Sequence, residues 1–144
     1  MSTRLLRTDL RRLKPIREPR LLTEIPQRVW TGDEWGRIQL GFRARDMDDR
    51  WHIFAEDNQL FLHRSWLGDG KYEAAFAEVE GGYRIVRVLI EDAEPRFPGG
   101  SDQEVCLLLE LLISSILLGE RVDELHRKLA ELRAATRPPQ PGDN

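Results

Sequence analysis

The sequence predicts an α+β domain in which a four-stranded antiparallel meander packs on a C-terminal apolar helix, with a short N-terminal helix and a final amphipathic helix. Two observations predict this class. Four runs rich in β-forming residues are separated by short turn sequences, and the most apolar stretch of the chain, 105–118, follows them. That stretch is apolar almost all round, so it must be covered on more than one side.

The turns are the clearest evidence for the meander. Asp57-Asn58 tolerates the positive φ angles of a tight hairpin, and Gly81-Gly82 marks a second hairpin. The sequence Gly68-Asp69-Gly70 links the two hairpins. The four strands are therefore expected at 50–56, 59–66, 71–80 and 83–91.

Capping sequences place the helices. Thr31-Gly-Asp-Glu34 has the pattern of a capping box and predicts a helix over 32–40, stopped near Gly41. Ser101-Asp-Gln-Glu104 has the same pattern and predicts a helix that runs to 118 and ends at Gly119. A final helix over 120–136 can cover a second side of the apolar helix through Val122, Leu125, Leu129 and Leu132.

The chain divides into a basic arm, a domain, a helix and a tail. Residues 1–28 form the arm: prolines prevent a long helix, and seven Lys/Arg in 1–20 stand against two acidic residues, a net of +5. We expect the arm to be partly disordered, either as a solvated tail or in contact with a partner, nucleic acid or the acidic remainder of the chain. The α+β domain spans 29–119, the amphipathic helix 120–136, and a disordered tail 137–144.

Composition excludes several classes. The single cysteine, Cys106, rules out internal disulfides and cysteine-rich zinc sites, and its apolar surroundings predict an inert thiol. Residues 21–144 carry a net charge of −8, which with the +5 of the first 20 residues gives the total of −3. This acidic remainder argues against nucleic-acid binding except through the arm. The start has no apolar leader and no stretch reaches the roughly 20 residues of a membrane span, so a cytoplasmic protein without membrane contact is expected.

The first hairpin predicts a register and hence two faces. If Asp57-Asn58 is a two-residue loop, Glu56 faces Gln59, and the register then makes Trp51 face Arg64. The side of the hairpin that carries Trp51 and Arg64 is mostly apolar and is expected to meet the helix. The other side pairs two phenylalanines and two histidines and ends in polar residues. The candidate binding surface drawn from this hairpin comprises Asp48, Asp49, Arg50, His52, His63, Arg64 and Ser65.

Several chemistries could use these residues, and none has a complete set. Two histidines with Asp48 or Asp49 lack a third metal ligand at an enforced spacing, so no metal and no cofactor are predicted. His63 could act as a general base, with Arg50 or Arg64 on a phosphate. The structural alternative is that Arg64 stacks on Trp51 and the other side is an ordinary solvated sheet face. No catalytic residue is assigned.

Four segments together resemble a known family. Trp30-Thr-Gly-Asp-Glu-Trp35, Met47-Asp-Asp-Arg-Trp51, Glu56-Asp57-Asn58 and His63-Arg-Ser-Trp66 resemble a small uncharacterised bacterial domain with the motif Met-Asp-Asp-(Lys/Arg)-Trp…His-Arg-Ser-Trp. That domain occurs alone or beside ADP-ribose-processing enzymes such as ADP-ribosylglycohydrolases and macrodomains. The resemblance covers about 29–119 and assigns no catalytic residue. His52 and Leu67 depart from it, standing where the family has an aromatic residue and threonine.

The expected function is a non-enzymatic binding or accessory domain. What the resemblance implies is recognition of an ADP-ribose-type ligand or of a partner enzyme. Two alternatives stay open: a small hydrolase or transferase that uses His63 on a nucleotide-like substrate, and an immunity or antitoxin protein whose acidic surface occludes a basic toxin site. A homodimer through the C-terminal helix is expected if its leucine stripe is left exposed.

Overall fold

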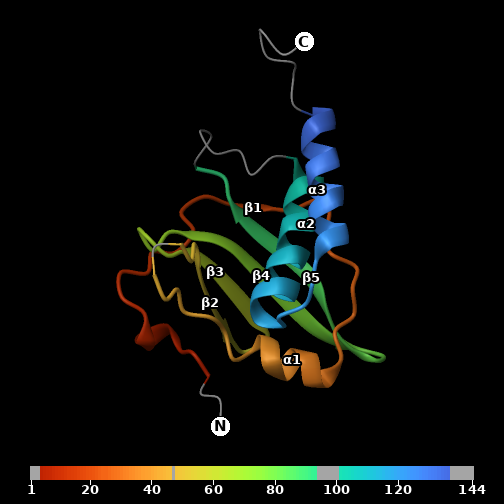
Figure 1. Cartoon of the computed structure of the whole chain (residues 1–144). Coiled ribbons are helices and arrows are strands. Elements are labelled where there is room, and N and C mark those ends of the chain that lie inside the picture. Colours follow the sequence, from red (N-terminus) through yellow and green to blue (C-terminus); the bar gives the residue numbers. More distant parts are fainter. Residues whose placement is uncertain (1–3, 47, 94–100, 137–144) are drawn as a thin grey trace, which may run out of the picture.

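Five antiparallel strands form one sheet in the computed structural model, which describes residues 4–46, 48–93 and 101–136. The strands lie in the order β1-β5-β4-β3-β2 (Figure 1). β2 pairs with β3, β3 with β4 and β4 with β5, all antiparallel, so the predicted meander and the α+β class are confirmed. The bounds are β1 Pro19–Leu21, β2 Trp51–Glu56, β3 Gln59–Arg64, β4 Gly70–Val79 and β5 Gly82–Glu91.

The predicted number of strands was wrong, because β1 adds a fifth strand from the segment expected to be an arm. It lies at the edge of the sheet, where Arg20 pairs with Ile90 and Leu21 with Leu89 of β5. A three-residue strand that begins at Pro19 has no alternating pattern from which it could be predicted. Proline is tolerated there because one side of an edge strand has no hydrogen-bonding neighbour.

The helices begin at the expected caps. Thr31 and Glu34 exchange the two bonds of a capping box at the start of α1 Gly32–Ile38. The Ser101 hydroxyl accepts the Glu104 N–H at the start of α2 Asp102–Leu112, which continues as a π-helical turn over Ile113–Leu117. After Gly119, at φ +67°, the final helix α3 Asp123–Thr136 starts three residues later than predicted.

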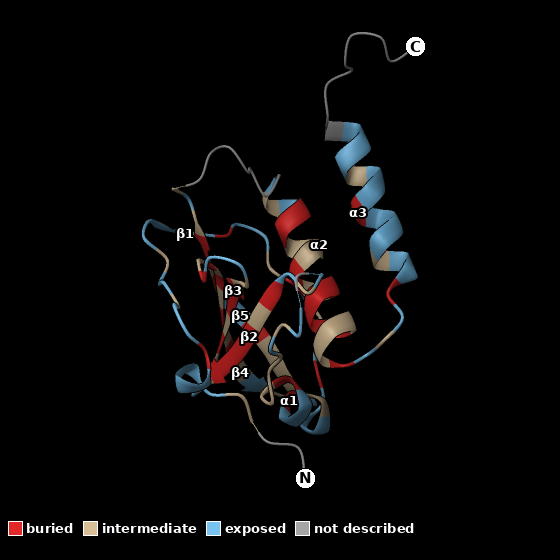
Figure 2. Ribbon diagram, turned by 60° about the vertical axis from the view of Figure 1, so that its left-hand side comes forward, coloured by how far each residue is buried: buried red, intermediate tan, exposed pale blue. Residues whose placement is uncertain are grey.

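The helices lie in two layers on one face of the sheet. Val105, Leu109 and Ile113 are buried in one cluster with apolar residues of β2 to β5, so α2 covers the sheet as predicted. The helix α3 packs on the outer side of α2 and is otherwise exposed (Figure 2). Of the predicted leucine stripe, Val122, just before this helix, and Leu129 are buried, and Leu125 and Leu132 are partly buried, so the helix folds back on α2 as expected. Among the described helices, none is long and apolar enough to cross a membrane.

The described part of the basic segment is held by acidic groups of the domain. Arg7 forms two 2.9 Å bonds to Glu56, and the backbone N–H groups of residues 17 and 18 bond the Glu91 carboxylate. Arg20 and Asp102 are joined by bonds of 3.1 and 3.2 Å. Of the three contacts that the sequence left open, the one with the chain's own acidic remainder is therefore formed. Residues 1–3 and the tail 137–144 lie outside the described residues.

Candidate functional site

The first hairpin has the register predicted from its turn. Trp51 pairs with Arg64, His52 with His63 and Glu56 with Gln59. Asp57 adopts φ +53°, the left-handed conformation that a two-residue hairpin requires. Local turn chemistry therefore determined which side chains share a face.

One candidate residue lies on the helix-facing side. The Arg64 guanidinium lies 5.0 Å from the centre of the Trp51 ring, and Trp51 in turn stacks on Tyr72 at 5.7 Å. This confirms the predicted cation–π pair. Arg64 is therefore separated from the polar side of the hairpin and does not belong to a surface formed there.

The opposite side of the hairpin is covered, which the prediction of a solvated face did not anticipate. The Arg7 guanidinium lies over Phe54 and Phe61, at 4.9 and 5.0 Å from their ring centres. Arg4 donates to the Ala55 carbonyl oxygen at 2.6 Å. The N-terminal segment thus shields this face from solvent, and Phe54 is fully buried.

His63 is enclosed beneath that segment and is only 3% exposed. Its Nδ1 atom lies 2.8 Å from the Gly68 carbonyl oxygen, and its ring lies 5.5 Å from that of Phe54. Burial lowers the pKa of His63, partly offset by the bond to Gly68. A general base must reach a substrate, and this buried position does not suit that role. His63 is therefore not part of the candidate surface.

His52, on the same face, has a defined tautomer. Its Nδ1 atom accepts the backbone N–H of Ala44 at 3.0 Å, so the ring proton lies on Nε2. Burial, the charge of Arg43 and then His63 lower the pKa of His52. The half-buried side chain is therefore a neutral imidazole that can donate one further hydrogen bond.

The segment before β2 is folded on itself by short-range bonds. Asp49 accepts from the Arg45 backbone and side-chain nitrogens, both at 2.9 Å, and the side-chain bond is the main cause that lowers its pKa. The Asp48 N–H bonds the Asp46 carboxylate at 2.9 Å. The Ser65 hydroxyl donates to the Asp49 carbonyl oxygen at 2.8 Å, which joins this segment to the end of β3.

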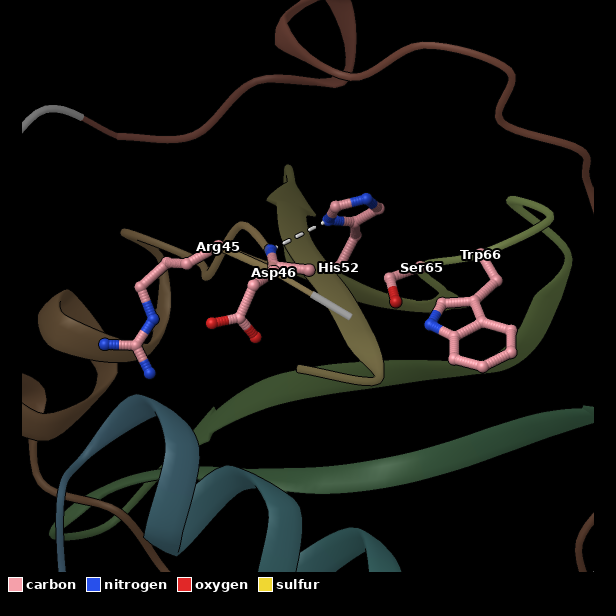
Figure 3. A pocket seen from close by; sticks show the side chains of 6 residues that line it. Arg45, Asp46, His52, Ser65 and Trp66 are labelled. Carbon is pink, nitrogen blue, oxygen red and sulfur yellow. Dashed lines mark hydrogen bonds between the residues drawn. The ribbon is translucent and has the colours of Figure 1, made fainter. Parts of the chain in front are cut away.

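A shallow pocket of about 280 Å³ lies between that segment and the turn after β3. Figure 3 shows Arg45 and Asp46 on one side of it and Ser65 and Trp66 on the other. Trp66 is 68% exposed and its neighbour Leu67 is 65% exposed. We call the set the Trp66 surface; its members are Ala44, Arg45, Asp46, His52, Ser65, Trp66 and Leu67.

Sequence reasoning found part of this surface. His52 and Ser65 line the pocket, and Asp49 contacts it through Ser65, whereas Asp48 and Arg50 are exposed outside the lining. The second strand of this hairpin was expected over 59–66, but β3 ends at Arg64, so Trp66 lies outside the sheet.

One sequence feature could have placed Trp66 correctly. The Gly68 N–H bonds the Arg64 carbonyl, so residues 65–67 form a turn. The Gly-Asp-Gly sequence directly after Leu67 indicates that turn, and two large apolar residues in a turn are typical of an exposed contact.

No metal centre is formed by the described residues, since no group of three His, Cys, Asp or Glu side chains converges among them. The Trp66 surface presents an aromatic ring, a guanidinium bonded to Asp49, a carboxylate, a neutral imidazole and a hydroxyl. No protein-family model, curated protein or solved structure matches this chain.

Proposed function

We propose that this protein is a non-enzymatic binding domain that recognises a protein partner through the Trp66 surface. The observation that carries the proposal is the exposure of Trp66 and Leu67 side by side in a turn. The other three tryptophans, Trp30, Trp35 and Trp51, are all buried. Exposed tryptophans beside polar groups are the residues on which protein interfaces most depend.

The size of the pocket supports a side chain as its occupant. Pockets that enclose a drug-sized ligand have volumes of about 300–1,000 Å³, and this one, at about 280 Å³, lies just below that range. A dinucleotide would remain largely in solvent here. An immunity or antitoxin protein would be one form of such a partner-binding domain.

An ADP-ribose-type ligand is a second candidate, and two observations favour it. Trp66 could stack on adenine, and Arg45 lines the same pocket. Against it, Arg45 is already bonded to Asp49, and the Asp46 carboxylate would repel a diphosphate.

Site-directed photo-crosslinking tests the proposal. A photoreactive benzoyl-phenylalanine replaces Leu67, or Val86 as a matched control, since Val86 is an exposed apolar residue of β5. The partner is identified by mass spectrometry, purified and titrated against the full chain. We expect crosslinking at residue 67 and not at residue 86.

The purified partner then decides whether the contact is specific. Trp66→Ala should weaken its binding about 30-fold, the effect of losing a central interface tryptophan, while Val86→Ala should change the Kd less than about twofold. Equal affinity of Trp66→Ala and the parent chain would refute the proposal. Saturable heat from ADP-ribose that disappears in Trp66→Ala would support the small-ligand candidate instead.

A further inference from the structure

The groups that line the Trp66 surface differ in whether their charge is already neutralised. Arg45 donates to both carboxylate oxygens of Asp49, at 2.9 and 3.4 Å. This pair leaves little positive charge for a ligand, because Asp49 balances Arg45 from outside the lining.

Asp46 is in the opposite situation. Its exposed carboxylate lines the pocket and accepts the Asp48 backbone N–H, a neutral donor. Among the described residues, no lysine or arginine forms an ion pair with Asp46. The charge of Asp46 also acts on Arg45, but the Arg45 guanidinium is hydrogen-bonded to Asp49, so the Asp46 carboxylate can still accept from a further cationic donor.

The remaining polar groups are neutral. His52 uses Nδ1 to accept the Ala44 N–H, which leaves Nε2–H as a single donor. The Ser65 hydroxyl proton is donated to Asp49, so the Ser65 oxygen can only accept a further bond. Arg43, which acts on His52 through its charge, lies outside the lining.

We propose, building on the function proposed above, that the pocket binds an arginine side chain of the protein partner. A guanidinium supplies several N–H donors for the Asp46 carboxylate and the Ser65 oxygen, and its planar cation stacks on indole. A phosphate would meet an unpaired carboxylate and an arginine that is already engaged. The whole chain, with its basic segment docked on the domain, has a net charge of −3, which adds only a weak long-range attraction for a basic partner.

Nuclear magnetic resonance titration of the ¹⁵N-labelled full chain tests the arginine site. The probe is acetyl-Gly-Arg-Gly-amide, and its controls are the citrulline tripeptide, which has the same shape without the charge, the glutamate tripeptide and ADP-ribose. We expect saturable shifts of the Trp66 indole N–H and of the residues beside it. The Kd should be about 1–10 mM, as suits a single side chain, and the citrulline peptide should bind at least about fivefold more weakly.

Three substitutions test whether the pocket favours a cation or an anion. Asp46→Asn, which keeps the acceptor oxygen, should weaken the arginine probe about fivefold, whereas Asp48→Asn, two residues away and outside the lining, should change it less than twofold. Arg43→Gln should leave the affinity for arginine equal or slightly higher. An anion site would give the reverse order for Asp46→Asn and Arg43→Gln.

The outcomes separate this inference from the function on which it rests. Equal binding of arginine and citrulline, unchanged affinity in Asp46→Asn, or shifts with ADP-ribose and none with the arginine peptide would each overturn the arginine site. The protein partner found by crosslinking supplies the second measurement. If it binds Asp46→Asn normally but not Trp66→Ala, the proposed function stands and the arginine site falls; if Trp66→Ala has no effect either, both fall.

Discussion

The Nδ1 atom of His63 lies 2.8 Å from the carbonyl oxygen of Gly68. Because a carbonyl only accepts, Nδ1 carries the ring proton. The same carbonyl accepts the Lys14 N–H at 2.9 Å. One backbone oxygen therefore joins the sheet, the turn that presents Trp66 and the N-terminal segment, and it makes His63 a structural residue.

The buried His63 should make stability depend on pH. Burial lowers its pKa below the ordinary 6.5, so the folded protein holds the neutral ring while the unfolded chain binds a proton as pH falls. The free energy of unfolding should therefore be highest above pH 7 and decrease towards pH 5, by at most about 1.4 kcal/mol per pH unit for this histidine. Urea titrations across that range should show a shallower decrease in His63→Gln.

His126 provides the control for this measurement, because it is exposed on α3. His126→Gln should keep the slope of the parent chain. Since His63→Gln also removes the bond to Gly68, the slopes and not the absolute stabilities are compared. Identical slopes in all three proteins would show that His63 is protonated equally in the folded and unfolded chains.

Gly68 should tolerate no side chain. It adopts φ +77°, and an added Cβ would lie 2.0 Å from the Arg12 carbonyl oxygen. Gly36 in α1 has nothing within 4 Å of an added Cβ. We expect Gly68→Ala to cost roughly 2–4 kcal/mol and Gly36→Ala to stabilise by up to about 1 kcal/mol, measured by urea unfolding. Equal stability of the two variants would contradict the packing at Gly68.

Arg7 should hold the N-terminal segment on the sheet. Its stacking on two phenylalanines and its bonds to Glu56 are half exposed, so Arg7→Ala should cost only about 1 kcal/mol. It should nevertheless accelerate tryptic cleavage in the segment that carries Arg11 and Arg12. Arg121→Ala is the matched control, because Arg121 is paired with Asp123 at the surface. Cleavage of Arg7→Ala at the rate of the parent chain would mean that other contacts are enough to hold the N-terminal segment on the sheet.

Cys106 should react slowly with thiol reagents. Burial, followed by the charges of Glu110 and Glu24, raises its pKa to about 11. At pH 8 its thiolate fraction is then about 100-fold below that of a thiol with the ordinary value of 9.0. Stopped-flow reaction with a disulfide reagent, compared with the urea-unfolded chain, gives a direct measurement, since the chain has one cysteine. Similar rates in both states would contradict the effect of burial.

The sequence by itself determined the local structure of this protein. The Asp57-Asn58 turn was sufficient for the register of the first hairpin, and Thr31 with Glu34 was sufficient for the start of α1, because these interactions span only a few residues. The class of the fold followed, since an apolar helix next to a meander can be buried in few ways.

Only the tertiary structure decided which faces of these elements meet solvent. Arg7 lies some fifty residues from Phe54 and Phe61 in the chain, and no periodicity in the sequence indicates that it covers them. That docking buries His63 and removes it from the candidate surface. Trp66 became exposed because β3 ends at Arg64 in a turn tied to the N-terminal segment. Contacts between distant segments depend on how the whole chain packs, which local patterns do not encode.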